Sequence, residues 1–188
     1  MSRSPGVGGR LEGASVVLRP LTGGDAGWIL PMLSEPEVEK WWGGYDLERV
    51  TGELLADEEE EWLAVELDGE PIGIVGWWEE PDAQYRYAGI DVSLRSGWHG
   101  RRLGSDAVRT LARWLVDERG HVRVTIDPAA DNDRAIRCYE RVGFRRVGVM
   151  RRYEHLASGE SRDGLLMDLL PEELTPHEGG MDPAAQPR

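Results

Sequence analysis

Residues 127–144 read DPAADNDRAIRCYERVGF, and they carry the clearest structural signals in the chain. Residues 123–127 predict a strand that ends at the Asp-Pro pair, and the loop behind it supplies Asn132. Residues 133–142 predict a helix that a glycine then ends. The carboxylate of Asp127 could face a cleft at the end of this strand, or it could simply start a turn, as Asp-Pro pairs commonly do.

The segment upstream joins a glycine- and arginine-rich loop to a long helix. Residues 96–105 read SGWHGRRLGS, in which Gly100 and Gly104 permit tight turns and two arginines add positive charge. Residues 104–118 predict an amphipathic helix, whose N-terminus offers free N–H groups to an anion. The sequence therefore predicts a pyrophosphate cradle. It matches neither a Walker loop nor a GxGxxG fingerprint, and an ordinary glycine-rich turn is the alternative.

The remaining hydrophobic pattern indicates one α/β domain over residues 14–170. The glycine-rich residues 1–13 and the Pro- and Gly-rich residues 171–188 are expected to be flexible tails. We expect a mixed central sheet of about six to seven strands flanked by about four helices. The further strands and helices are predicted at 16–20, 25–33, 47–56, 62–67, 70–78, 87–94, 144–152 and 165–170.

Charge is distributed unevenly along the chain, whose formal net charge is −13. Residues 35–82 contain 17 acidic residues against Lys40 and Arg49, whereas residues 95–152 contain 14 arginines against 7 acidic residues. The acidic run at 57–61 could be no more than a solvated surface. An asymmetry of this size also suits a protein that binds a cationic ligand on one side and an anionic ligand on the other.

Composition argues against several classes of protein. The acidic net charge disfavours a nucleic-acid-binding protein, and no apolar run is long enough to span a membrane. The N-terminus lacks the apolar core of a signal peptide, and the single cysteine, Cys138, is expected to be a small buried thiol. We therefore expect a cytoplasmic protein, monomeric or homodimeric. The four histidines show no metal-ligand spacing, so no metal site is expected.

The order of strand, glycine-arginine loop, helix and strand, followed by N-x-x-A-x-x-x-Y-x-x-x-G-F at 132–144, resembles the GNAT superfamily of N-acetyltransferases. This resemblance covers residues 15–170 and implies the single-domain GNAT fold with acetyl-CoA as co-substrate. Within this superfamily, the branch that acetylates hydroxylysine-type siderophore precursors is closely related to the aminoglycoside 6′-N-acetyltransferases. A narrower likeness, to the aminoglycoside 6′-N-acetyltransferases, rests on WWGG at 41–44, GEPIG at 69–73, WWEE at 77–80 and GIDVSL at 89–94, together with DP, N, RAIRCYE and GF within residues 127–144.

The chain departs from the family at two positions of the cofactor loop. His99 stands where the family usually has glutamine or arginine, and Arg102 stands where it usually has a second glycine. We expect Arg102 to donate its backbone N–H to the cofactor only if its φ stays negative, because a positive φ favours glycine.

Acetyl transfer requires that the acceptor amine lose a proton and that the departing thiolate gain one. The resemblance implies that Asp91 accepts the first proton and that Tyr139 donates the second or hydrogen-bonds the sulfur. Burial beside other carboxylates would raise the pKa of Asp91 from its ordinary value of about 3.9. Alternatively, Asp91 could cap a loop at the end of its strand, and Tyr139 could be an aromatic packing residue.

The resemblance also implies binding residues. The backbone of Val92 and Leu94 is expected to pair with the pantetheine arm, which Asn132 would hydrogen-bond. The expected acetyl-CoA site comprises Val92, Leu94, His99, Gly100, Arg101, Arg102, Gly104, Ser105, Asn132 and Tyr139. The expected acceptor site comprises Trp41, Trp42, Tyr45, Trp78, Glu79, Asp91, Asp127 and Asp163.

Within the acceptor site, Trp41, Trp42 and Tyr45 are expected on a loop loosened by glycines, with Trp42 facing the ligand. Alternatively, one of the two tryptophans packs on the core. Trp78 and Glu79 lie in a stretch displaced from the family's loop. A polycationic antibiotic needs carboxylates for its ammonium groups and flat aromatic surface for its sugar rings.

The sequence therefore predicts an aminoglycoside 6′-N-acetyltransferase that transfers acetyl directly within a ternary complex. One alternative is an acetyltransferase for another amine, such as a siderophore precursor or a protein N-terminus. A second is a catalytically idle module that binds acetyl-CoA.

Overall fold

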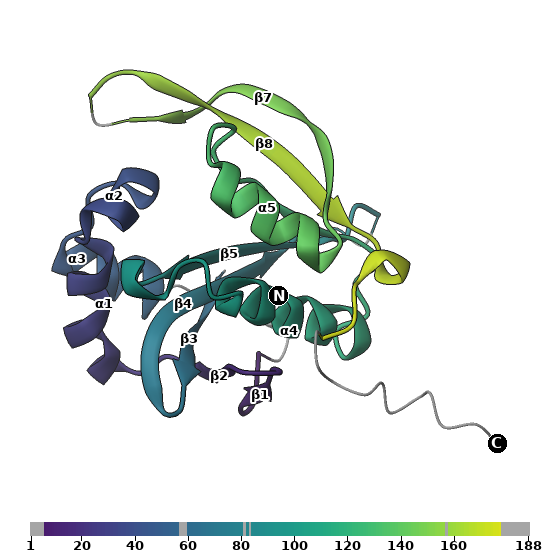
Figure 1. Ribbon diagram of the computed structural model, residues 1–188, viewed down its shortest axis with the longest axis horizontal. Coiled ribbons are helices and arrows are strands. Elements are labelled where there is room, and N and C mark those ends of the chain that lie inside the picture. The colour runs from purple at the N-terminus through teal and green to yellow at the C-terminus, as the bar shows by residue number, and fades with distance from the viewer. Residues whose placement is uncertain (1–5, 57–59, 81, 83, 157, 178–188) are drawn as a thin grey trace.

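One mixed sheet forms the centre of the molecule in the computed structural model, which describes residues 6–56, 60–80, 82, 84–156 and 158–177 (Figure 1). Its strands are β1 Leu11–Glu12, β2 Val17–Pro20, β3 Glu61–Leu67, β4 Glu70–Glu79, β5 Ala88–Leu94, β6 Val124–Ile126, β7 Arg145–His155 and β8 Ser161–Leu169. They follow the spatial order β1-β2-β3-β4-β5-β6-β8-β7. Neighbouring strands are antiparallel except β5 and β6, which are parallel.

Helices lie on both faces of this sheet, and within the described ranges they are α1 Ala26–Leu33, α2 Pro36–Trp42, α3 Leu47–Arg49, α4 Leu103–Asp117 and α5 Asp133–Val142. Short 3₁₀ helices are η1 Gly23–Asp25, η3 Ser96–Trp98 and η4 Pro171–Glu173, and η2 Val50–Leu54 is a π-helical turn. The predicted α/β class is confirmed. In the described part of the chain, no helix combines the length and apolarity needed to cross a membrane.

Two cores are separated by the sheet because neighbouring residues of a strand point to opposite faces. Along β3, Leu63 joins the larger core beneath α4, α5 and β8, whereas Trp62 joins a smaller core against α1, α2 and η2. The central strands β3 and β4 are therefore buried on both sides, which explains their nearly continuous hydrophobic runs.

The N-terminal segment corrects the predicted tail boundary. Residues 6–13 were expected to be flexible, but they contain β1, which pairs with β2 and adds an eighth strand to the sheet. The side chain of Val7 is 5% exposed, and its N–H donates to the Glu61 carboxylate at 2.9 Å. The two residues of β1 and the buried Val7 are too few, among so many glycines, to form the alternating hydrophobic pattern that predicts a strand. Residues 1–5 lie outside the described residues.

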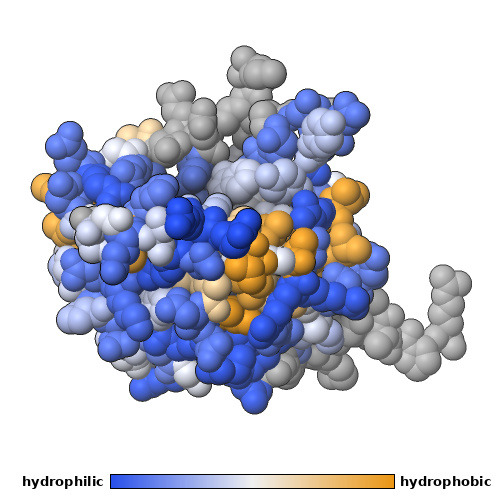
Figure 2. Space-filling model, turned by 90° about the horizontal axis from the view of Figure 1, so that it is seen from above, coloured by the Kyte–Doolittle hydropathy of each residue, from blue (hydrophilic) through white to orange (hydrophobic). Residues whose placement is uncertain are grey.

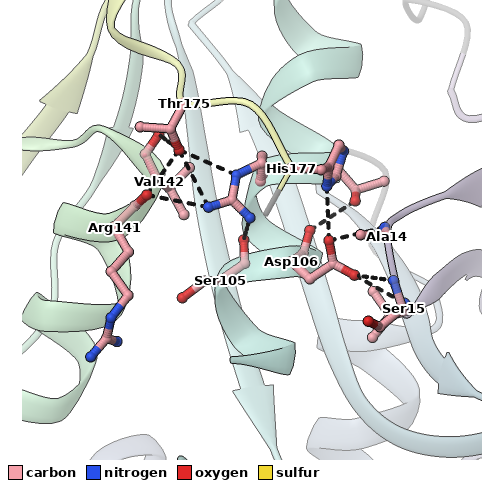
Figure 3. Close-up of polar contacts among 11 residues, drawn as sticks. Ala14, Ser15, Ser105, Asp106, Arg141, Val142, Thr175 and His177 are labelled. Atoms are coloured by element: carbon pink, nitrogen blue, oxygen red, sulfur yellow. Dashed lines mark hydrogen bonds and ion pairs between the residues drawn. The ribbon is translucent and has the colours of Figure 1, made fainter. Parts of the chain in front are cut away.

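The C-terminal segment also corrects a predicted tail, because residues 171–177 are fixed to α4 and α5 (Figure 3). The N–H of Thr175 donates to the carbonyl of Val142 at the end of α5 (3.0 Å). The buried carboxylate of Asp106 lies 2.9 Å from His177 Nδ1 and also accepts backbone N–H groups from the segment before β2. These bonds join distant elements, so local composition does not reveal them.

The segment of the two adjacent tryptophans is a helix rather than the predicted loop. Pro36 occupies the first position of α2, acidic residues follow in its first turn, and Gly43 ends the helix with a φ of +70°. Trp41 and Trp42 are therefore the last two residues of α2. The start and stop signals were present, but Val38 is the single buried residue of this seven-residue helix, so apolar residues do not recur at helical spacing.

The hairpin of β7 and β8 forms the far edge of the sheet and arches over α5 (Figure 1). Val147 and Val149 of β7 are 52% and 59% exposed. Figure 2, which looks onto this side of the molecule, shows an apolar area bordered by hydrophilic residues. The arginines of β7 at 145, 146, 151 and 152 place like charges along the edge, which disfavours pairing of β7 with β7 of a second copy.

Candidate active site

A cleft of about 890 Å³ opens where β5 and β6 part. The two strands pair only at Ala88↔Val124 and Gly89↔Thr125, so beyond this point the backbone of β5 borders the cleft. The cleft brings together most of the predicted site residues, namely Trp41, Trp42, Tyr45, Asp91, Val92, Leu94, His99, Gly100, Arg102, Gly104, Ser105, Asp127, Asn132, Tyr139 and Asp163.

Asp91 on β5 and Asp127 just beyond β6 both line this cleft. Burial, and then the negative charges of Asp127 and Glu60, raise the pKa of Asp91 to about 7. Asp127 itself accepts a hydrogen bond from the hydroxyl of Tyr153. A carboxylate with a pKa near neutrality is suited to accept a proton from a substrate amine, because general bases work best with a pKa close to the working pH.

Tyr139 on α5 is 6% exposed and packs against Phe144, with ring centroids 6.3 Å apart. Burial raises the pKa of the Tyr139 phenol well above its ordinary value, so the hydroxyl keeps its proton and acts as a hydrogen-bond donor. Burial also raises the pKa of the Cys138 thiol, which lies 3.2 Å from the Ser105 hydroxyl. A protonated thiol is a poor nucleophile, which argues against a covalent acyl-cysteine.

The cofactor loop enters α4 through a left-handed residue. Arg102 has φ +64° and ψ 2°, so the negative φ that the sequence required of it is not observed. Arginine takes the backbone conformation that a glycine would take here, at a cost of about 1 kcal/mol. Gly100 is also left-handed, with φ +77°. The backbone of this turn therefore has the shape expected for a glycine at position 102, although the residue there carries a guanidinium group.

His99 is bonded to the end of β5, because its Nε2 lies 2.8 Å from the carbonyl oxygen of Leu94. Burial lowers the pKa of His99, so the ring is neutral and Nε2–H donates to this carbonyl. This hydrogen bond occupies the carbonyl of Leu94, part of the backbone that was expected to pair with the pantetheine arm. Val92, the other residue expected to pair with the arm, also lines the cleft.

Two other predicted cofactor residues have structural bonds within the cleft wall. Asn132 caps α5, since its side-chain oxygen accepts the N–H of Ala135 at 3.2 Å. The hydroxyl of Ser105 lies 3.2 Å from the carbonyl of Cys138, which joins α4 to α5. The Asn132 side chain can still contact a cofactor through its amide nitrogen or through the second lone pair of its oxygen.

The aromatic residues at the end of α2 differ in their surroundings. Trp42 packs edge-on against buried Trp62, with ring centroids 5.5 Å apart, so it is the tryptophan that packs on the core. The ring of Trp41 makes cation–π contacts with two side chains. Lys40 Nζ lies 4.4 Å and the guanidinium carbon of Arg162 lies 5.3 Å from the ring centroid. Both tryptophans line the cleft, and Tyr45 lies beside Trp42.

Three predicted site residues lie outside the lining of this cleft. Trp78 covers Gly89 and packs against Tyr87, with ring centroids 5.4 Å apart. The carboxylate of Glu79 lies 3.1 Å from a guanidinium nitrogen of Arg119 and 3.0 Å from Nε2 of His121. Arg101 stacks on Trp98 and borders a smaller pocket. The structure therefore separates Trp78 and Glu79 from Asp91, because β4 continues past the cleft.

The cleft also contains residues that the sequence did not single out. Its acidic side gains Glu37, Glu53, Glu60 and Glu154, and its basic side gains Arg134, Arg137 and Arg141. The three arginines recur at spacings of three and four along α5, which places them on one helix face and was visible in the sequence. The glutamates come from separate elements, so no local pattern joins them.

The acidic side of the cleft is also braced internally. One carboxylate oxygen of Asp163 on β8 accepts the N–H of Arg152 on β7 at 2.7 Å. Arg152 itself is left-handed, with φ +53°, at an irregularity of the hairpin. Asp163 is therefore both a cleft residue and a hairpin brace.

A family described as the acetyltransferase (GNAT) domain matches residues 15–145. This chain belongs to the GNAT acetyltransferase family. It is 33% identical over 155 residues to aminoglycoside N(6′)-acetyltransferase type 1 of Klebsiella pneumoniae, covering 72% of this chain and 77% of that protein. It is also 40% identical over 75 residues to a kanamycin resistance protein of Rhizobium radiobacter, covering 39% of this chain and 68% of the other.

Solved structures agree with this assignment. Aminoglycoside acetyltransferase AAC(6′)-Ib in complex with coenzyme A and kanamycin superposes with a TM-score of 0.69 at 28% identity, over 85% of this chain and 96% of that one. A GNAT-family acetyltransferase from Bacillus anthracis gives 0.75 at 17% identity, over 87% and 99%, and shows the fold alone. The predicted enzyme class, an acetyl-CoA-dependent N-acetyltransferase, is confirmed, and acetyl-CoA is its co-substrate.

Proposed function

We propose that this acetyltransferase transfers acetyl from acetyl-CoA to the 6′-amine of an aminoglycoside antibiotic and thereby inactivates it. The observation that carries this proposal is the separation of charge within one cleft. Carboxylates of α2, η2, β5, β7 and β8 line one half, which we call the acidic half, and arginines of the α4 entry loop and α5 line the other, the arginine half.

The arginine half suits acetyl-CoA, whose phosphates are anionic. The α4 N-terminus adds its positive dipole end and free N–H groups to the charge of Arg102. The acidic half suits a small polycation, because several carboxylates attract ammonium groups and the rings at the end of α2 offer apolar surface to sugars. The relatives named for acetylating aminoglycosides at the 6′ position support the same acceptor.

We propose direct transfer at the point where the two halves meet. The acceptor amine passes its proton to Asp91 and attacks the thioester carbonyl, which forms a C–N bond and a tetrahedral intermediate. Collapse of the intermediate breaks the C–S bond. The nitrogen loses a second proton during this collapse. The thiolate is stabilised by a hydrogen bond from the hydroxyl of Tyr139 and takes up this second proton, either directly or through Tyr139, whose phenol is then restored. The first proton, which Asp91 accepted from the acceptor ammonium, returns to solvent.

The proposal is tested by measuring thiol release from acetyl-CoA with kanamycin, gentamicin, a hydroxylysine and an N-terminal peptide as acceptors. We expect turnover with at least one aminoglycoside, and NMR of the product should place the acetyl group on the 6′-amine. Turnover with the hydroxylysine or the peptide alone would contradict the proposed acceptor while leaving the family assignment intact.

A further inference from the structure

We propose that Arg162 is a positioning residue that holds the two outer walls of the acidic half at a fixed separation. Its guanidinium links the β7–β8 hairpin to the end of α2, and this link determines how well the site binds its acceptor. The inference rests on the proposed function for the identity of that acceptor, but not for the existence of the link.

The bonds of Arg162 reach in two directions. Its Nε and one terminal nitrogen donate to the carboxylate of Glu154, at 2.9 and 2.5 Å, across the hairpin. The other terminal nitrogen donates to the carbonyl of Lys40 at 2.9 Å, 122 residues away in the chain. In Figure 1 the free end of the hairpin reaches toward α2, which agrees with this contact.

The end of α2 is a favourable partner for a cation. The carbonyl of Lys40 lies in the last turn, where carbonyls lack partners within the helix and where the helix dipole is negative. Arg162 also covers the ring of Trp41, with 5.3 Å from its guanidinium carbon to the ring centroid. The Arg162 side chain is only 13% exposed, and its bonds to Glu154 are partly buried, whereas its bond to the Lys40 carbonyl lies at the surface.

The two residues that Arg162 holds are themselves lining residues. Trp41 and Glu154 both face the cleft, from α2 and from β7, whereas Arg162 does not belong to the lining. The start of α2 is fixed separately, because the Glu35 carboxylate accepts the N–H of Ser96 at 2.7 Å. Without Arg162, α2 keeps this attachment to the cofactor loop but loses the guanidinium bond to the hairpin.

Electrostatics alone predicts the opposite change in the acceptor KM, so kinetic measurements can distinguish the two explanations. Removal of a positive charge from an acidic site strengthens its attraction for a polycation and lowers the KM for the acceptor. Loss of a positioning residue raises that KM instead, because the walls no longer hold the acceptor in place.

The experiment compares Arg162→Ala, Arg162→Lys and the control Arg146→Ala, each with saturating acetyl-CoA and an aminoglycoside. Arg146 lies on the same hairpin and pairs with Glu140 at 2.8 Å, so the control removes an equal charge and an ion pair but leaves α2 untouched. We expect Arg162→Ala to raise the acceptor KM about tenfold, with the KM for acetyl-CoA changed less than about twofold. Arg162→Lys keeps the charge but lacks the planar fork, so it should show the same direction of change.

Hydrogen exchange of the backbone amides of α2 gives a second measurement that needs no acceptor. We expect exchange in α2 to quicken in Arg162→Ala and to stay unchanged in Arg146→Ala. An acceptor KM that falls or stays constant in Arg162→Ala, or α2 exchange equal to that of the control, would overturn the proposal. If the native enzyme turns over no aminoglycoside, the proposed function fails, and the exchange measurement alone decides whether Arg162 holds α2.

Discussion

The two halves of the cleft are assembled in different ways. The arginine half is built from the loop before α4 and from α5, and it depends on local features such as the left-handed Arg102 and a helix N-terminus. The acidic half draws its carboxylates from α2, η2, β5, β7 and β8 and is held by long-range bonds such as that from Arg162 to Lys40. Substitutions in one half should therefore leave ligand binding in the other half nearly unchanged.

Asp91 and Tyr139 lie where the halves meet, so they should be exceptions to this independence. Asp91 belongs to β5, the strand that is expected to border the cofactor, yet its pKa is raised by burial and by the negative charges of Asp127 and Glu60. Tyr139 lies on α5 with the arginines, but it must reach the sulfur beside the acceptor. Chemistry rather than binding should fail when either is changed.

The largest effect is expected for Asp91→Asn, because an amide cannot accept the amine proton. We expect kcat/KM for the acceptor to fall at least about 100-fold, with the affinity for acetyl-CoA unchanged. Steady-state kinetics measures kcat/KM for the acceptor, and calorimetric titration measures the affinity for acetyl-CoA. Near-normal turnover would remove Asp91 from the mechanism.

Tyr139→Phe should have the next largest effect. The ring still packs against Phe144, but the leaving thiolate loses its hydrogen-bond donor, so kcat should fall about 10- to 100-fold. Folding is checked by the thermal midpoint, which should stay close to that of the native protein. An unchanged kcat at saturating substrates would show that the thiolate is protonated by another group.

A smaller effect, confined to the acidic half, is expected for Tyr153→Phe. The hydroxyl of Tyr153 donates to Asp127, and its loss leaves that carboxylate less well oriented toward the acceptor. We expect the acceptor KM to rise about three- to tenfold. A parallel rise in the KM for acetyl-CoA would contradict the independence of the two halves.

The smallest effect on activity is expected for Glu79→Gln, although the family resemblance placed Glu79 in the acceptor site. Its carboxylate is engaged by Arg119 and His121 away from the cleft. We expect the acceptor KM to stay within about twofold, while the free energy of unfolding falls by about 1–3 kcal/mol. Chemical denaturation measures the second quantity. A large rise in acceptor KM with unchanged stability would return Glu79 to the site.

The sequence was sufficient for the fold class and for the loop and helix that build the arginine half, because their signals are local, although the arginines of α5 were not singled out. Gly143, for example, has φ +118°, and an added Cβ would come within 2.0 Å of the Glu173 carbonyl oxygen, so only glycine can end α5 there. Asn132 and Tyr139 stand at fixed spacings from it on the same helix. A contiguous motif of this kind preserves its geometry wherever the fold places it.

The acidic half could be predicted only in part. Asp91 and Trp41, which the family resemblance assigned to the acceptor site, line the cleft. Trp78 and Glu79 lie outside its lining, because a strand pattern does not show where a neighbouring strand diverges. Glu154 and Arg162 were missed because their roles arise from contacts between segments far apart in the chain. The predicted tails failed for the same reason, since their anchors are bonds to distant helices and strands.

The central claim, that Asp91 is the base at the meeting point of the two halves, is tested most directly by the pH dependence of kcat/KM for the acceptor. Because the pKa of Asp91 is raised to about 7, the carboxylate is protonated and inactive below that pH. We predict that kcat/KM rises about tenfold per pH unit below pH 7 and reaches a plateau above it, and that this inflection is absent in Asp91→Asn. A profile with no inflection near pH 7, rising instead to the acceptor's own amine pKa, would contradict it.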